Sequence, residues 1–150
     1  MTVTVGIDPG LSGAIAFLSP DGELEHLADL PVIRDGKLAW IDAQAMTSMM
    51  IDTLQGRPAR AVIERVQAFP GQGRSSCFNF GVSFGSLLAL VQARYLPIEL
   101  VTPAVGSALW ASVATSAPRW TKPGCSSPQR ISAWPNTKAV LNRSCWPTGG

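Results

Sequence analysis

This 150-residue chain has a single histidine and only three cysteines. The single histidine, His26, falls in a polar, strand-like stretch, so we expect a surface position for it and no imidazole catalysis. Cys77, Cys125 and Cys145 lack the spacing of a metal site. An odd number of cysteines without a signal segment predicts reduced thiols and a cytoplasmic protein.

Long apolar runs are also missing. No unbroken run approaches the roughly 18–20 residues of a membrane span, and no basic-then-apolar leader opens the chain. The sequence therefore predicts no membrane association. A hydrophobic share of 46% over this length is that of one globular domain with a core of its own.

Acidic residues are absent after Glu99. Residues 1–99 carry ten acidic and seven basic side chains, a net charge of −3, whereas residues 100–150 carry five basic side chains and no acidic one. A basic tail commonly indicates attraction to nucleic acid. The tryptophans, prolines and serines of this tail point to a different explanation.

Two carboxylates interrupt apolar strands. The strand Val3–Ile7 runs into Asp8 and a Pro-Gly turn, and Glu64 is embedded in the apolar run Ala61–Val66. A carboxylate at the end of a buried strand is costly unless a cation receives it. The pattern predicts a metal or phosphate site. Two simpler interpretations stay open: Asp8 as a turn former, and Glu64 as an edge residue that faces solvent.

Turn residues separate segments of strand-like and helix-like periodicity. Asp42 is the expected N-cap of the first helix, Ser75 or Ser76 that of the second, and the strand between the helices reads as central and parallel. These features predict an α/β fold with a mixed sheet. The predicted elements are strands at Thr2–Asp8, Gly13–Ser19 and Glu23–Asp29, a helix at Asp42–Leu54, a strand at Arg60–Val66, a helix at Ser76–Tyr95 and a strand at Pro97–Val101.

The second predicted helix is apolar nearly all round, so we expect it to be buried. Gly81 and Gly85 lie four residues apart and would form a smooth stripe for close packing against the sheet.

Four motifs, in order, resemble those of RuvC-type Holliday junction resolvases, especially phage-like members of this RNase H-like superfamily. They are Gly6-Ile7-Asp8-Pro9-Gly10, Val62-Ile63-Glu64, the loop Pro70-Gly71-Gln72-Gly73 with the helix start that follows it, and Leu100-Val101-Thr102-Pro103. The resemblance covers roughly residues 2–105. It implies an RNase H-like mixed sheet of three antiparallel meander strands plus parallel strands, flanked by helices.

The resemblance also implies a function: hydrolysis of phosphodiester bonds at four-way DNA junctions by a homodimer that uses two Mg²⁺ ions. Asp8 and Glu64 match the family's metal-binding, catalytic positions. Mg²⁺ prefers hard oxygen ligands, and a pair of such ions can activate the attacking water and stabilise the leaving oxygen. By the same resemblance Gln67, Phe69 and Arg74 would meet the DNA, Phe69 as a wedge against bases and Arg74 at phosphate. Phe69 packed under its own loop is an equal alternative.

The pattern breaks after Val105. The family has two more acids on a C-terminal helix, and this chain has none there. Four of the five tryptophans fall in residues 106–150, among scattered prolines and serines without helical period. We therefore divide the chain into a resolvase domain, residues 1–105, and an aberrant Pro/Ser/Trp-rich basic tail, residues 106–150, which we expect to be poorly ordered.

A single-base deletion near codon 105 would explain this tail. If each codon's last base is joined to the next two bases, Val105-Gly106-Ser107-Ala108 can be read as V-W-K-R. The residues from Thr137 can then be read as E-G-R-A-E-S-L-L-L-A-D-W, which resembles the family's acidic helix. The hypothesis implies that this chain lacks half of the metal site and that its activity is doubtful.

Two other functions compete with the resolvase. A non-catalytic nucleic-acid-binding module of RNase H-like fold would bind without cleavage, with strong salt dependence. An actin- or sugar-kinase-like ATPase would need two domains around its nucleotide, and the chain has neither the length nor a P-loop or GxGxxG motif. No nucleotide cofactor is therefore expected.

Overall fold

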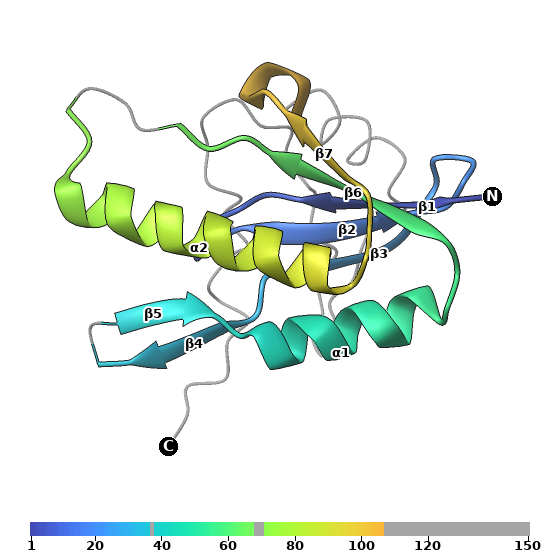
Figure 1. Cartoon of the computed structure of the whole chain (residues 1–150), viewed down its shortest axis with the longest axis horizontal. Coiled ribbons are helices and arrows are strands. Elements are labelled where there is room, and N and C mark those ends of the chain that lie inside the picture. Colours follow the sequence, from blue (N-terminus) through green and yellow to red (C-terminus); the bar gives the residue numbers. More distant parts are fainter. Residues whose placement is uncertain (37, 68–70, 107–150) are drawn as a thin grey trace, which may run out of the picture.

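The structure is a computed structural model, and it describes residues 1–36, 38–67 and 71–106 (Figure 1). The predicted tail begins at residue 106, and its residues 107–150, with the altered reading frame proposed for them, lie outside the described residues. The described elements are, in order, β1 (Val3–Ile7), β2 (Ala14–Leu18), β3 (Leu24–Asp29), β4 (Val32–Asp35), β5 (Leu38–Ile41), α1 (Ala43–Leu54), β6 (Ala59–Glu64), α2 (Arg74–Ala93) and β7 (Ile98–Val101).

Five strands form one mixed sheet in the order β3-β2-β1-β6-β7. The first three pair antiparallel, as the short turns between them require, while β6 pairs parallel with both β1 and β7. The meander and the central parallel strand were both predicted from the sequence, and both predictions are confirmed. Strand β6 is the continuous apolar strand because it has a neighbour on each side.

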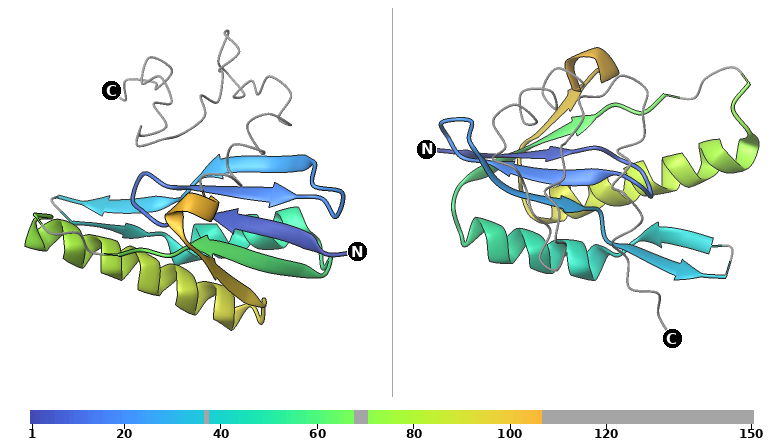
Figure 2. Two further views of the ribbon diagram at one scale, coloured as in Figure 1. Left: turned by 90° about the horizontal axis from the view of Figure 1, so that it is seen from above. Right: turned by 180° about the vertical axis from the view of Figure 1, so that it is seen from behind.

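One face of the sheet carries the main core. Alternate strand residues, among them Val5 on β1 and Ala61 on β6, pack against buried residues of both helices, such as Met50 on α1 and Leu87 on α2. Both helices therefore lie on the same side of the sheet (Figure 2). Asp42 caps α1 as predicted, because its carboxylate accepts a hydrogen bond from the Ala45 amide at 2.9 Å.

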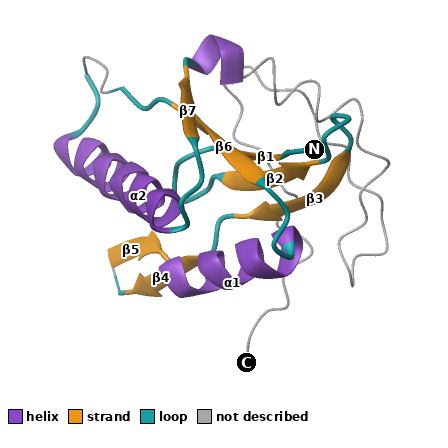
Figure 3. Ribbon diagram, turned by 45° about the vertical axis from the view of Figure 1, so that its right-hand side comes forward, coloured by secondary structure: helices purple, strands orange, loops and turns teal. Residues whose placement is uncertain are grey.

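A two-stranded hairpin, β4–β5, was not predicted. The sequence marks only its turn, Asp35-Gly36, because strands of four residues give little periodicity. In the structure Ile41 is buried in the core, while Ile33 and Trp40 form a cross-strand pair that is exposed on the outer side. The hairpin packs beside α2 through β5 (Figure 3).

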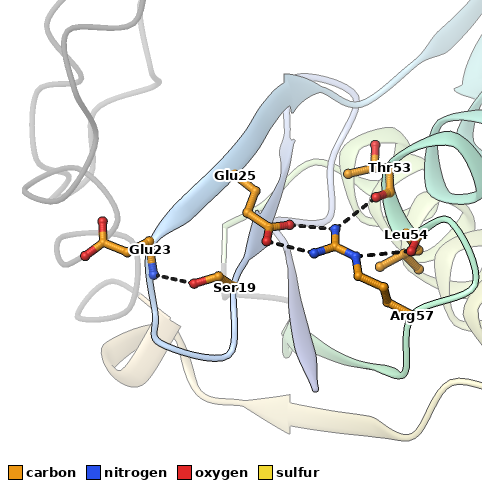
Figure 4. Close-up of polar contacts among 6 residues, drawn as sticks. All are labelled: Ser19, Glu23, Glu25, Thr53, Leu54 and Arg57. Atoms are coloured by element: carbon orange, nitrogen blue, oxygen red, sulfur yellow. Dashed lines mark hydrogen bonds and ion pairs between the residues drawn. The ribbon is translucent and has the colours of Figure 1, made fainter. Parts of the chain in front are cut away.

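Arg57 fastens the outer strand β3 to the end of α1 (Figure 4). Its guanidinium donates to both carboxylate oxygens of Glu25, at 2.8 and 2.7 Å, and to the carbonyl oxygens of Thr53 and Leu54. The hydrogen bonds from Arg57 lower the pKa of Glu25. This fork satisfies carbonyls that the helix leaves free at its C-terminus.

Three expectations about α2 are wrong. The helix is not buried all round, since Phe78 is 71% exposed and Val82 39%. Gly81 and Gly85 do not pack against the sheet, because a Cβ at either position would meet no atom within 4 Å. Its N-cap is Gly73, without a side-chain cap, and neither Ser75 nor Ser76 takes that place. Core contacts are concentrated in the C-terminal half, at Leu87, Leu90 and Val91, because the N-terminal half runs beyond the sheet (Figure 1).

Within the described ranges, α2 is also the helix that is long and apolar enough to cross a membrane, judged by length and composition alone. Core helices of globular proteins pass the same test, so the observation is weak.

Candidate metal centre

The pairing of β1 with β6 sets the two predicted carboxylates side by side. The parallel register matches Ile7 with Ile63. Asp8 and Glu64 each come one residue later, so they lie next to each other at the carboxyl ends of adjacent strands. Ile7 and Ile63 point into the helix-covered core, and the alternation of side chains sends Asp8 and Glu64 to the opposite face.

A tight loop holds the backbone of Asp8. The Asp8 amide donates to the carbonyl of Ala14 at 2.9 Å, and the Gly13 amide donates to the carbonyl of Gly10 at 3.1 Å. A Cβ at position 13 would stand 2.0 Å from the carbonyl oxygen of Asp8, so only glycine fits without a shift of the backbone. In the described ranges the Asp8 carboxylate has no hydrogen bond to this loop, so the turn-former interpretation gains no support.

The two carboxylates are mutually unfavourable as they stand. Burial raises the pKa of Asp8 from 3.8 to about 6, and the nearby charge of Glu64 adds to the rise. Burial also raises the pKa of Glu64. The ion pairs found among the described residues, Arg57–Glu25 and Arg60–Glu99, leave both carboxylates without a cationic partner.

This arrangement fits a divalent cation. Two half-buried carboxylates that repel each other offer hard oxygen ligands, and a cation would remove the repulsion and replace the lost hydration. Residues 1–36, 38–67 and 71–106 contain no cluster of three or more potential ligands, so the described site consists of this pair.

The predicted DNA-contacting residues lie on the segment that leads from β6 to α2. Gln67 and Arg74 are both exposed, and Arg74 is the first residue of the helix. Phe69 lies outside the described residues, so its two interpretations both stay open. The first amides of α2 have no side-chain cap, which suits a helix start that faces an anion.

Sequence reasoning missed three residues that shape the site. Gly13 and Gly106 touch Asp8 and Glu64 respectively, and the ring of Phe80 reaches over Gly10 from α2. Glycines near turns are too common for their presence alone to reveal a close contact. Phe80 belongs to a helix that is apolar nearly all round, so the sequence does not distinguish it from the core residues of that helix.

The fold agrees with that of a solved RuvC structure. A structure described as T. thermophilus RuvC in complex with Holliday junction substrate superimposes with a TM-score of 0.52 at 20% identity, over 69% of this chain and 64% of that one. Another Thermus thermophilus RuvC structure gives a TM-score of 0.46 at 17% identity, over 68% and 64%, which is too low to add to the argument. No protein-family model and no curated protein matches the sequence.

The described residues therefore have a RuvC-like fold with a mixed sheet, as the four motifs predicted. The chain aligns with less than two thirds of the length of the RuvC chain in that complex.

The raised pKa of Asp8 predicts a pH-dependent gain in stability for Asp8→Asn. A carboxyl whose pKa is raised on folding stabilises the fold fully below about pH 4, and this contribution is lost as the pH rises through about 6. Without divalent cations, Asp8→Asn should be more stable than wild type at pH 7.5 by about 1–3 kcal/mol, and the difference should shrink at pH 4.

Urea unfolding in EDTA at the two pH values measures this difference. Asp52→Asn, on the exposed side of α1, removes the same charge away from the site and serves as the control. Equal or lower stability of Asp8→Asn at pH 7.5 would contradict the electrostatic account.

Proposed function

We propose that this chain is a RuvC-type DNA-junction protein whose Asp8 and Glu64 bind Mg²⁺ and which acts on four-way junctions. The observation that carries the proposal is the adjacent, half-buried carboxylate pair without a cationic partner among the described residues. Proteins rarely keep such a pair unless a cation neutralises it in use. The shared fold with a RuvC that was solved on a Holliday junction supports DNA as the partner.

Asp8 and Glu64 have distinct parts in this proposal. Asp8 lies at the strand end, held by the Gly13 loop, and would anchor the metal. Glu64, at the end of β6, would supply a second carboxylate ligand to the same metal. When bound there, Mg²⁺ lowers the pKa of a coordinated water and stabilises charge on phosphate oxygens. The pair would hold the ion where a phosphodiester can reach it.

This sequence supplies two of the family's four metal-binding carboxylates, Asp8 and Glu64. No acidic residue follows Glu99, so this reading frame does not encode the remaining two ligands of a resolvase. We propose that residues 1–105 are the resolvase domain and that residues 106–150 are out of frame. The chain as it stands then binds junctions and cleaves them poorly or not at all. The same shortage of ligands favours the second candidate, a non-catalytic nucleic-acid-binding module.

The proposal includes a homodimer through the outer face of α2. That face exposes Phe78 and Val82, and Gly81 and Gly85 leave open space in which a second helix could approach closely. Helix α1 offers a single large exposed apolar residue, Ile51. Since two symmetric cuts need two active sites, a twofold dimer suits a junction nuclease.

Cleavage of a labelled synthetic four-way junction in Mg²⁺ tests the proposed function. The chain as it stands should bind the junction but cleave it at least about 100-fold more slowly than the product of a gene with one base restored near codon 105. In the frame-restored protein, Asp8→Asn should abolish cleavage.

Resequencing codons 100–110 decides which of the two proteins the natural gene encodes. Full cleavage by the chain as it stands would overturn the claim of an incomplete site. Failure of both proteins to bind the junction would overturn the proposal itself.

Arg74→Ala should weaken junction binding and lower the dependence of log K on log [salt] by about 1, because one phosphate contact is lost. Arg94→Ala is the matched control. Arg94 follows the other end of α2, about 30 Å away along the helix. Fluorescence anisotropy at several NaCl concentrations gives both quantities, and equal effects of the two substitutions would remove Arg74 from the interface.

Phe78→Asp should convert the dimer to a monomer in sedimentation analysis, because a charge in the centre of an apolar interface loses its hydration. Ile51→Asp places the same charge on α1 and should leave the dimer intact. Dissociation by Ile51→Asp alone would move the interface to α1, and a monomeric wild type would exclude the dimer.

A further inference from the structure

Phe80 of α2 lies over the loop that follows Asp8. A Cβ built at Gly10 would stand 3.8 Å from Cζ of Phe80 and 3.9 Å from Cε2, which is ordinary van der Waals contact. Both atoms belong to the far edge of the ring. Gly10 is buried although it belongs to a turn, while Phe80 stays 39% exposed. The ring therefore covers the loop from the side of the helix.

Hydrogen bonds fix the shape of this loop and its position on the sheet. The Asp8 amide donates to the carbonyl of Ala14, and the Gly13 amide donates to that of Gly10. At the end of β3, the Leu30 amide donates to the Gly13 carbonyl at 3.0 Å. These bonds join the loop to itself and to the sheet, and none of them reaches a helix. Because Gly10 belongs to the same bonded unit as Asp8, a group that packs on Gly10 also restrains Asp8.

The core holds the ring of Phe80 in its place. Phe84, one turn further along α2, packs against the main core, and Leu87 is fully buried in it. Residues three and four positions apart are neighbours on one helix face, so Phe80, Phe84 and Leu87 form a single row. This row begins in the core and ends over the loop of Asp8.

On the basis of the proposed function, we infer that Phe80 is a positioning residue for Asp8. Its ring supports the helix side of the loop, so that the Asp8 carboxylate lies beside Glu64 before a cation binds. A ligand that is already in place loses less conformational freedom on binding, which raises the affinity for the metal. Phe80 and the whole loop precede residue 106, so the role is the same in either reading frame.

The edge of the ring makes the contact, and this allows reach to be separated from hydrophobicity. Leucine ends at its δ carbons, so Phe80→Leu keeps the apolar base of the side chain and loses Cε2 and Cζ. Methionine carries a methyl group at the ε position on a flexible chain, so Phe80→Met can touch the loop again. Metal affinity should follow the reach of the side chain.

Titration of the full chain with Mn²⁺, with the free ion followed by EPR, tests this role. Phe80→Leu should weaken Mn²⁺ binding about 10-fold, the lower end of the range for groups that orient a metal ligand. Phe80→Met should recover most of that loss. The melting temperatures of both variants in EDTA should stay close to that of wild type, because the side chain is already partly exposed.

Phe84→Leu is the matched control, since it makes the same change one turn along the helix, where the ring packs against the core. It should lower the melting temperature and leave Mn²⁺ affinity unchanged. Wild-type affinity in Phe80→Leu, an equal loss in Phe84→Leu, or no recovery in Phe80→Met would overturn the positioning role alone. No Mn²⁺ binding by the wild-type chain would overturn the proposed function as well.

Discussion

The parallel pairing of β1 with β6 is the constraint on which the rest of the molecule depends. It aligns Ile7 with Ile63 and thereby brings Asp8 and Glu64 together one residue later. A slip of one residue would move one strand's side chains to the other face of the sheet and separate the two carboxylates. The register is secured from the opposite face, where Val5 and Ala61 are fully buried under the two helices. The core and the site are therefore two sides of the same pairing.

This arrangement places two carboxyls with raised pKa values on the two adjacent strands that also carry core residues. Burial raises the pKa values of both carboxyls, and the charge of Glu64 adds to the rise at Asp8, so their ionisation works against folding. Each large apolar side chain buried on the helix-covered face contributes about 1.5–3 kcal/mol, which is enough to offset one such carboxylate. In the proposed function this cost would favour cation binding, because a bound cation would relieve the repulsion at Asp8.

Helix α2 links the core to the surfaces that the proposed function needs. Its C-terminal half supplies Leu87 and Val91 to the core. Its N-terminal half projects past the sheet, exposes Phe78 and begins at Arg74 beside the predicted DNA-contacting segment. The apolar residues of α2 are therefore of two kinds: those of the C-terminal half are buried in the core, and those of the N-terminal half are exposed on the surface. Composition cannot distinguish them, because both favour the same residue types.

The sequence by itself determined the local features: three meander strands, the Asp42 cap, the central apolar strand, and a carboxylate carried by each of two apolar strands, at the end of the first for Asp8 and within the second for Glu64. The structure instead ends β6 at Glu64. Each of these local features depends on neighbours along the chain, such as a turn, a cap or a run of apolar residues. Only the tertiary structure decided that α2 is half exposed, that β4 and β5 pair, and that Gly106 lies against Glu64. These depend on contacts between segments far apart in sequence, and a glycine carries no side chain from which such a contact could be read.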